Sequence, residues 1–179
     1  RVSGRDEHNW YNVHIYAYNG YGGKTVKTAT FAFQYNVGFN YNKPLNAAGT
    51  MNNASEGTRT VVYNTAYGTL PKPSMTGWTF NGWYTAASGG NKVEGTDAYK
   101  YVYGTTLYAH WTANRYTVNF NYNKPSNASS NITNCNTANK SVTYDSAYGT
   151  LPEPSLNGWK FEGWYTSANK RVISSDIYR

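Results

Sequence analysis

Histidine, acidic and cysteine side chains are the groups of this chain that could carry catalysis or hold a metal, and their spacing supports neither. The histidines are His8, His14 and His110. The nine acids are scattered and form no Asp-x-Asp-x-Asp calcium loop. Cys135 is the single cysteine, so it can form neither an internal disulfide nor a multi-cysteine metal site. We therefore expect no catalytic residue, no metal and no cofactor.

Aromatic and amide side chains suggest a different chemistry, which is carbohydrate binding. Trp and Tyr rings can stack on the apolar face of a sugar, and Asn offers hydrogen-bond donors and acceptors. The candidate ligand-binding residues form two matching sets: Trp78, Trp83 and Tyr84, and Trp159, Trp164 and Tyr165. Strand alternation sends one Trp of each set to a core and leaves the other half exposed. The favoured alternative is that both rings fill a core, because small β modules depend on aromatic burial.

These aromatic residues belong to an internal repeat. Residues 35–85 align with residues 116–166 at an offset of 81 without a gap, and 28 of the 51 pairs are identical. A repeat of fixed period indicates an array of modules, and units of about 80 residues are long enough to fold around their own cores. We expect the last strands of a preceding β module (1–34), a complete first repeat (35–114) and a second repeat without its final strand (115–179). The natural protein is accordingly expected to continue.

Alternating apolar and polar residues predict short strands joined by turns. Before the repeats, residues 10–18 form one predicted strand and residues 24–33 return as another. The strands predicted for the first repeat cover residues 35–41, 60–63, 78–85 and 106–111. No stretch has a sustained helical period, so the predicted fold class is mainly β. The joins at residue 34 and at residues 112–115 are almost without linker, which favours a stiff arrangement.

Charge and apolar segment length each argue against one class of partner. The net charge of +7 is spread along the chain without a basic run, whereas nucleic-acid binding favours a concentrated basic patch. No segment has the apolar length needed to cross a membrane. Asp97 and Asp176 are the acids that occupy the same place in both repeats, and capping or turn stabilisation explains them without catalysis. We expect no nucleic acid and no membrane insertion.

The pattern from residue 35 to residue 111 resembles the Listeria–Bacteroides repeat, the module known as the B repeat in internalin B. The residues that carry the resemblance are Pro71, Pro73, Gly77-Trp78-x-Phe80-x-Gly82-Trp83-Tyr84-Thr85 and Leu107-Tyr108-Ala109-x-Trp111. Residues 116–179 match as a truncated copy. Both copies depart from the family in a long insert after the first strand, and in Trp at positions 78 and 159, where Tyr is usual.

The resemblance implies a linear array of small β-grasp-like modules of the α+β type, without known catalytic residues. Such modules occur on large bacterial proteins that are secreted or held at the cell surface, and a Gram-positive source is favoured. Residues 9–33 resemble the end of a streptococcal Bsp-like surface repeat, a β-sandwich, through strand residues such as Tyr11, Val13 and Ile15.

Two functions remain open at this point. The favoured one is a non-catalytic spacer or display stalk with a protein-interaction region in adhesion. Its partners would be neighbouring domains of the same chain and an unidentified host or bacterial surface protein or glycan. The alternative is a carbohydrate- or cell-wall-polymer-binding module attached to a secreted enzyme. Short junctions favour the first function, whereas exposed aromatic rings would favour the second.

Overall fold

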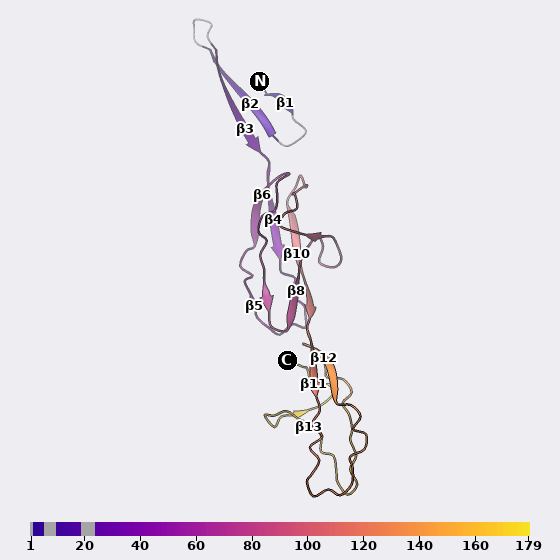
Figure 1. Ribbon diagram of the computed structural model, residues 1–179. Helices are drawn as coiled ribbons and strands as arrows, with labels where there is room; N and C mark the ends of the chain where they lie inside the picture. Colours follow the sequence, from indigo (N-terminus) through magenta and orange to yellow (C-terminus); the bar gives the residue numbers. More distant parts are fainter. Residues whose placement is uncertain (1, 6–9, 19–23) are drawn as a thin grey trace. The chain divides into compact units, whose positions relative to one another are not determined.

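In the computed structural model, residues 2–5, 10–18 and 24–179 are described, with side chains from residue 32 onward. This part of the chain consists of β-strands, turns and bends (Figure 1). The predicted mainly β class is confirmed, and the helix that an α+β module would add is not found among these residues. The same residues contain no helix that is long and apolar enough to span a membrane.

The first sheet precedes the repeats. It contains β1 (Val2–Arg5), β2 (Trp10–Tyr18) and β3 (Lys24–Ala32), in that order and antiparallel, with Trp10 opposite Ala32. The two strands predicted here are confirmed as β2 and β3. The turn between them lies outside the described residues, as do the side chains on which the resemblance to a Bsp-like repeat rests. Phe33 alone separates β3 from the first strand of the repeat.

Four longer strands form the frame of the first repeat: β4 (Gln34–Asn40), β6 (Thr58–Val62), β8 (Trp78–Tyr84) and β10 (Thr105–Ala113). Each predicted strand of this repeat matches one of them to within two residues at either end. The sheet also contains three two-residue strands, β5 (Met51–Asn52), β7 (Ser74–Met75) and β9 (Lys92–Val93). Two residues are too few to show alternation, so the sequence pattern could not indicate these strands.

The sheet of the first repeat has the order β5-β7-β8-β10-β4-β6, with β9 paired to β8. The first and last long strands of the repeat, β4 and β10, run parallel, with Leu107 opposite Phe39. The pairs β4–β6, β5–β7 and β8–β9 are antiparallel. A parallel pair needs a crossover connection, and residues 41–104, which carry the rest of the repeat, provide it.

Large side chains from the two parallel strands and β8 fill the core. Trp83 in β8 is 2% exposed and Leu107 in β10 is 1% exposed. Val37 in β4 is fully buried. The Trp83 ring meets Phe39 edge to face, with 4.9 Å between ring centroids. Aromatic pairs in this geometry stabilise a core beyond the area that they bury. Trp83 is the largest fully buried side chain of the first repeat.

The second repeat reuses part of this design. Its strands are β11 (Arg115–Asn119), β12 (Asn139–Thr143), β13 (Trp164–Tyr165) and β14 (Arg171–Val172). β11 pairs with β12 and β13 with β14, both antiparallel. Val142 in β12 is 3% exposed, as Val61 is in the matching strand β6 at 5%.

The loops repeat their conformation although their sequences diverge. Asn53 and Asn134 correspond at the offset of 81, and both have φ of 55°. In the same loop, Ala47 N donates to Pro44 O and Ala128 N donates to Pro125 O, each at 3.0 Å. Asn tolerates positive φ better than most residues do. Matched Asn positions thus preserve the path of a loop whose other residues have changed.

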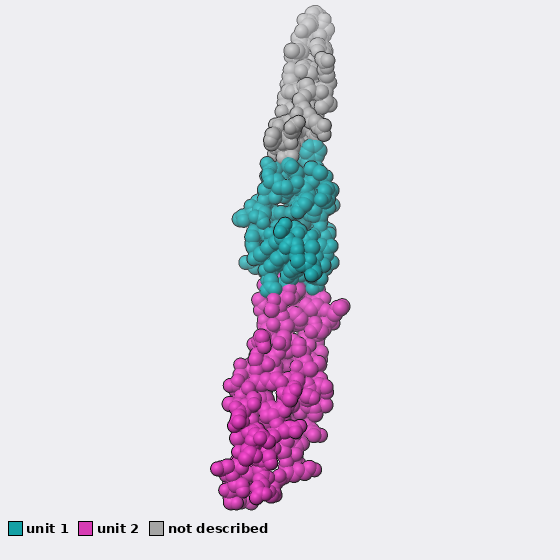
Figure 2. All heavy atoms as spheres, turned by 90° about the vertical axis from the view of Figure 1, so that its right-hand side faces the viewer, with its two compact units in different colours: residues 1–42, 53–73, 81–110 teal, residues 43–52, 74–80, 111–179 magenta. Residues whose placement is uncertain are grey.

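Packing divides the chain into two compact units, which do not follow the repeat boundaries (Figure 2). Unit 1 contains residues 1–42, 53–73 and 81–110. Unit 2 contains residues 43–52, 74–80 and 111–179, so it joins three segments of the first repeat, including its last four residues, to the whole of the second. Modules at 1–34, 35–114 and 115–179 remain a prediction.

Replacing Trp83 tests the core of the first repeat. We expect Trp83→Ala to lower the free energy of unfolding by about 3–5 kcal/mol, because it leaves a large cavity and removes two ring contacts. Val102→Ala is the control, since Val102 is 67% exposed and should change the stability by less than about 0.5 kcal/mol. Urea unfolding followed by far-UV circular dichroism measures both. Equal stability of the two variants would contradict the assigned core.

Candidate functional site

Trp83 and its counterpart Trp164 take the same structural position. The Trp83 indole Nε1 donates to Pro71 O at 2.8 Å, and the Trp164 Nε1 donates to Pro152 O at 2.7 Å. Trp164 lies 4.7 Å from Phe120, as Trp83 lies close to Phe39. Trp83 is buried and Trp164 is partly buried, and each ring packs on an aromatic side chain with its indole N–H satisfied by a backbone carbonyl.

Tyr84 and His110 form a stacked pair in unit 1. Their ring centroids are 3.9 Å apart and their planes differ by 7°. The His110 Nε2 atom lies 2.9 Å from Ala86 O. The ring thus faces a tyrosine and a backbone carbonyl, with no acid or nucleophile among these contacts. The side chains of His8 and His14 lie outside the described residues.

The candidate residues of the second repeat come together at one cavity. Trp159, Trp164 and Tyr165 line one cavity of about 700 Å³. Trp159 is 47% exposed and Tyr165 is 49% exposed. The remaining walls come from two stretches of unit 2: Asn121, Tyr122, Asn123, Pro125 and Ile132, and Pro154, Ser155, Leu156, Lys160, Phe161, Glu162, Gly163, Thr166 and Ser167. Trp78, Trp83 and Tyr84 lie elsewhere.

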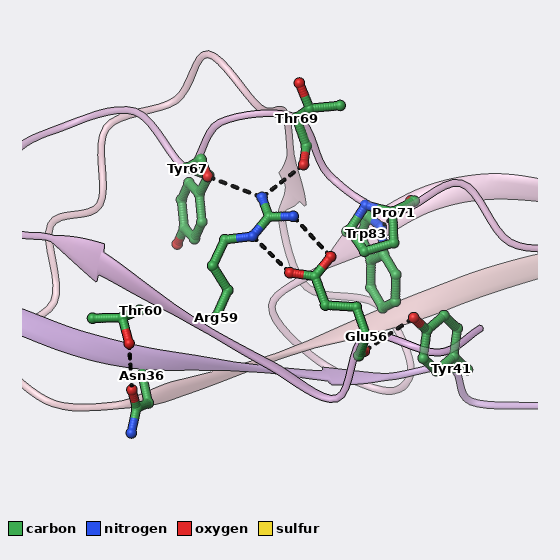
Figure 3. A network of polar contacts seen from close by, with 9 residues as sticks. All are labelled: Asn36, Tyr41, Glu56, Arg59, Thr60, Tyr67, Thr69, Pro71 and Trp83. Carbon is green, nitrogen blue, oxygen red and sulfur yellow. Dashed lines mark hydrogen bonds and ion pairs between the residues drawn. The ribbon is translucent and has the colours of Figure 1, made fainter. Parts of the chain in front are cut away.

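A polar network holds the long loop of the first repeat (Figure 3). Arg59 donates from Nε and Nη2 to the two carboxylate oxygens of Glu56, at 2.7 and 2.8 Å. Its Nη1 atom reaches Thr69 O at 2.6 Å. In the second repeat Lys140 takes the place of Arg59 and donates to Thr150 O at 2.5 Å. In both repeats the basic residue at this position donates a hydrogen bond to a backbone carbonyl ten residues later and so fixes the intervening segment. This is a structural role.

The acids shared by both repeats also have structural roles. The Asp97 Oδ2 atom accepts from Glu94 N at 2.8 Å, and the Asp176 Oδ2 atom accepts from Ile173 N at 3.0 Å. The turn stabilisation predicted for this pair is confirmed. No group of three or more His, Cys, Asp or Glu side chains that could hold a metal occurs in the part of the chain that the structure describes.

Asp145 is the most unusual charged residue of unit 2, and sequence reasoning missed it. Its side chain is completely buried. The Oδ2 atom accepts hydrogen bonds from Trp78 Nε1 at 3.0 Å and from Ala48 N at 3.2 Å. The Oδ1 atom accepts from Arg179 Nε at 2.9 Å. A single carboxylate of the second repeat is therefore bonded to two segments of the first.

The backbone of Asp145 is bonded as well. Its amide donates to Tyr178 O at 2.9 Å, and its carbonyl accepts from Asn46 Nδ2 at 3.3 Å. A buried carboxylate is costly unless it is paired and hydrogen-bonded, and here every polar atom has a partner. Burial raises the pKa of the Asp145 carboxyl group, but the hydrogen bonds, led by that of Trp78, together with the Arg179 charge hold the pKa below its ordinary value.

Asn114, the single residue between β10 and β11, is fixed in the same region. Its amide donates to Gly77 O at 2.8 Å, and its carbonyl accepts from Tyr144 N at 2.9 Å. The Thr79 hydroxyl donates to Asn114 Oδ1 at 2.6 Å. A Cβ atom on Gly77 would lie 2.1 Å from the Tyr144 ring, so the ring packs directly on the glycine. We call Trp78, Asn114, Asp145 and their hydrogen-bond partners the junction cluster.

One difference between the repeats could have revealed this cluster. The counterpart of Asp145 is Asn64, which has φ of 60° against 54° for Asp145 and is exposed. Lys100, the counterpart of Arg179, donates to Asn64 Oδ1. Both repeats thus have a residue in the left-handed backbone conformation that is bonded to a basic side chain. Only in the second repeat is that residue a carboxylate. The sequence contains this exchange but does not show which segments cover it.

Comparison with known families gives an independent result. The model of the Listeria-Bacteroides repeat domain matches residues 35–110 and again residues 116–176. The two matches cover more than three quarters of the chain. The chain belongs to the Listeria–Bacteroides repeat family. It carries two copies of this repeat in tandem, which confirms the resemblance found in the sequence.

Two relatives of known sequence share the Listeria–Bacteroides repeat region. Internalin H of Listeria monocytogenes is 32% identical over 93 residues, which cover 52% of this chain and 15% of the relative. A protein of Evansella cellulosilytica described as a Gly-rich membrane protein is 31% identical over 115 residues, which cover 59% of this chain and 12% of the relative. The chain therefore spans a small part of the length of either relative. No solved structure matches it significantly.

Replacing Asp145 tests the junction cluster. We expect Asp145→Asn to lower the free energy of unfolding at pH 7 by about 1–3 kcal/mol, because an amide cannot accept hydrogen bonds at both of its terminal atoms. Asn suits this backbone, as Asn64 shows at the matching position. The control is Asn64→Asp, which adds an exposed carboxylate and should change the stability by less than about 1 kcal/mol.

The effect should depend on pH in a defined direction. Because the folded-state pKa of Asp145 lies below its ordinary value, the carboxylate stabilises the fold fully above about pH 4 and loses this effect as pH falls through the folded-state pKa. The difference between wild type and Asp145→Asn should therefore shrink in urea titrations from pH 7 toward pH 2. A difference that stays constant over this range would rule out the carboxylate as its source.

Proposed function

We propose that the chain is a non-catalytic repeat segment of a large bacterial protein, located at the cell surface or secreted, that spaces and displays a neighbouring domain. The junction cluster carries this proposal. A spacer needs successive repeats that are fastened to one another, since a flexible joint would let the displayed domain collapse onto its anchor. In unit 2, Asn114 is the whole linker, and its backbone amide, its backbone carbonyl and its side-chain oxygen are all hydrogen-bonded.

The buried carboxylate adds specificity to this fastening. Asp145 can be buried without penalty only when the loop of Ala48 and the indole of Trp78 are in place, since they supply its hydrogen bonds. A displaced segment would leave a charge without its partners. Such an arrangement favours one geometry over near alternatives, which is what a stiff spacer needs.

Family membership supports the remaining parts of the proposal. Repeats of this family occur in an internalin and in a protein described as a membrane protein, which supports an extracellular, surface-attached location in a Gram-positive bacterium. The parallel pairing of the first and last strands of the repeat supports a β-grasp-like module. Partners would be neighbouring domains and, in adhesion, a surface protein or glycan of the host or of another bacterium.

A second candidate function is recognition of a glycan or wall polymer. The observation that favours it is the cavity of the second repeat, where the half-exposed Trp159 and Tyr165 lie near amide side chains. Ligand pockets of this size combine aromatic walls with a few polar groups. In the first repeat the matching residues are engaged otherwise, since Trp83 is buried and Tyr84 is stacked on His110.

Exchange of the repeats in the parent protein separates the two functions. We expect the displayed activity, measured as adhesion or as activity of the neighbouring domain, to survive when both repeats are replaced by an unrelated rigid module of the same length. It should fall when the replacement is a flexible Gly/Ser linker with the same number of residues, because such a linker does not hold its ends apart. Loss with the rigid replacement, together with glycan-array binding by the native chain that Trp159→Ala removes, would establish recognition instead.

A further inference from the structure

One pair of strands connects the beginning of the first repeat to its end. The repeat begins with β4 and ends with β10, which are hydrogen-bonded neighbours in the sheet, and neither is an edge strand. Both strands run in the same direction, with a register from Thr105 opposite Val37 to Tyr108 opposite Asn40. The chain therefore enters the repeat at one end of this pair and leaves it at the other end.

The parallel direction decides how the pair responds to tension along the chain. Tension pulls β4 toward Gln34 and β10 toward Ala113, so the two strands are drawn past each other. The hydrogen bonds of a parallel pair are evenly spaced, and a sliding movement strains all of them at the same time. The whole ladder thus resists the force together.

The sheet before the repeat shows the opposite case. β2 and β3 are antiparallel, and the first residue of β2, Trp10, lies opposite the last residue of β3, Ala32. Tension applied at these two residues loads only the pair at the end of the ladder, and the hydrogen bonds then break one after another. A ladder of the same length resists less force in this arrangement, because only its outermost bonds carry load at any time.

Buried side chains on both strands of the parallel pair add to its resistance. Val37 and Phe39 of β4 are buried, and so are the residues of β10 that follow the paired segment into the core, Leu107 and Ala109. Sliding one strand past the other would take these side chains out of their packing positions. Protein interiors are packed at the density of organic crystals, so such a displacement is costly before the core opens.

Asn42 ties the two strands together just beyond the backbone ladder. It follows β4, and its Nδ2 atom donates to Ala109 O of β10 at 3.1 Å and to Ala87 O at 2.9 Å. The Asn42 backbone has φ of 46°, and its amide donates to Asn40 Oδ1 at 2.9 Å. One side-chain hydrogen bond thus joins the strand that enters the repeat to the strand that leaves it.

We propose that the first repeat bears tensile load along the chain, with the β4–β10 pair as its mechanical clamp. Residues 41–104 lie between these strands in the sequence, so they cannot extend until the clamp breaks. This function goes beyond spacing, because a spacer only has to resist bending. The load arises when the neighbouring domain is held by another cell or surface while the chain is anchored at its own.

Pulling the same fold in two directions tests the proposal. In a Cys135→Ser background, one variant carries Gln34→Cys and Thr112→Cys, at opposite ends of the clamp. The other carries Gln34→Cys and Val102→Cys, at the same end. All three positions are exposed, so the added thiols can take the handles of an optical trap. At equal loading rate, we expect opposite-end attachment to require about three times the unfolding force of same-end attachment or more, since forced unfolding follows the unfolding rate.

The length released in the first step identifies the element that breaks. With opposite-end handles, rupture of the clamp frees the chain from Gln34 to Thr112 in one step, which adds roughly 240 Å of extended chain. Urea unfolding without load should give the same stability for both pairs of handles, because only the direction of pulling differs between them.

A third comparison changes the clamp itself. Asn42→Asp removes the Nδ2 donor and retains a side chain that tolerates positive φ, and we expect it to raise the unfolding rate under opposite-end load about fivefold. Under same-end load it should have little effect, because the ladder opens from the end that lies away from Asn42. Asn53→Asp is the matched control, since Asn53 also has positive φ but lies outside both strands, and it should behave as the parent variant does.

Three outcomes would overturn the proposal. Equal forces in the two pulling directions would show that the direction of the strands does not matter. A first step much shorter than the whole segment would show that another part of the repeat yields before the clamp. Equal rates for Asn42→Asp and Asn53→Asp under opposite-end load would separate the force barrier from this pair. None of these results would affect the exchange experiment that tests the spacer function.

Discussion

Packing of one indole ring against neighbouring aromatic side chains is the constraint on which each repeat depends. A module of this size without a described helix has few residues that lie away from water, so a large fraction of its core must come from single rings. Trp83 meets Phe39 and Tyr41 and uses its N–H on Pro71 O, and Trp164 does the same with Phe120, Tyr122 and Pro152. The matched proline and aromatic positions of the two repeats are therefore the positions that contact this ring. In both repeats the ring has two aromatic neighbours and its N–H is hydrogen-bonded.

Around this common core, the exchange of one residue changes which segments of the chain that residue contacts. Asn64 and Asp145 share a backbone conformation and a neighbouring base. The amide stays exposed, whereas the carboxylate is buried under the loop of Ala48 and the indole of Trp78. A charge buried in this way requires complete hydrogen bonding, which Asp145 has. The turn at Asn64 and the junction cluster at Asp145 thus differ in one side chain and in the segments that bury it.

The sequence predicted the features that local patterns determine. Alternation located the four long strands of the first repeat and the pair before it, and the offset of 81 identified the copies. The pattern could not locate β5, β7 or β9, whose two residues carry no period, nor the repeated left-handed conformations of Asn53 and Asn134 within a diverged loop. Asp145 was missed for another reason. Its partners lie 67 and 97 residues earlier in the chain, and no local pattern reports such contacts.

The exchange at Asn64 and Asp145 also gives the repeats an order. A repeat with a carboxylate at this position needs another repeat before it that offers an indole N–H and a backbone amide, whereas a repeat with an amide side chain there does not. The two copies are therefore not interchangeable, although more than half of their aligned residues are identical. Recombination between the two copies would have to keep the carboxylate together with its hydrogen-bond donors. Otherwise the carboxylate would lie without the indole N–H and the backbone amide that bond it here. The side chain at this one position thus distinguishes the first repeat of the pair from the second.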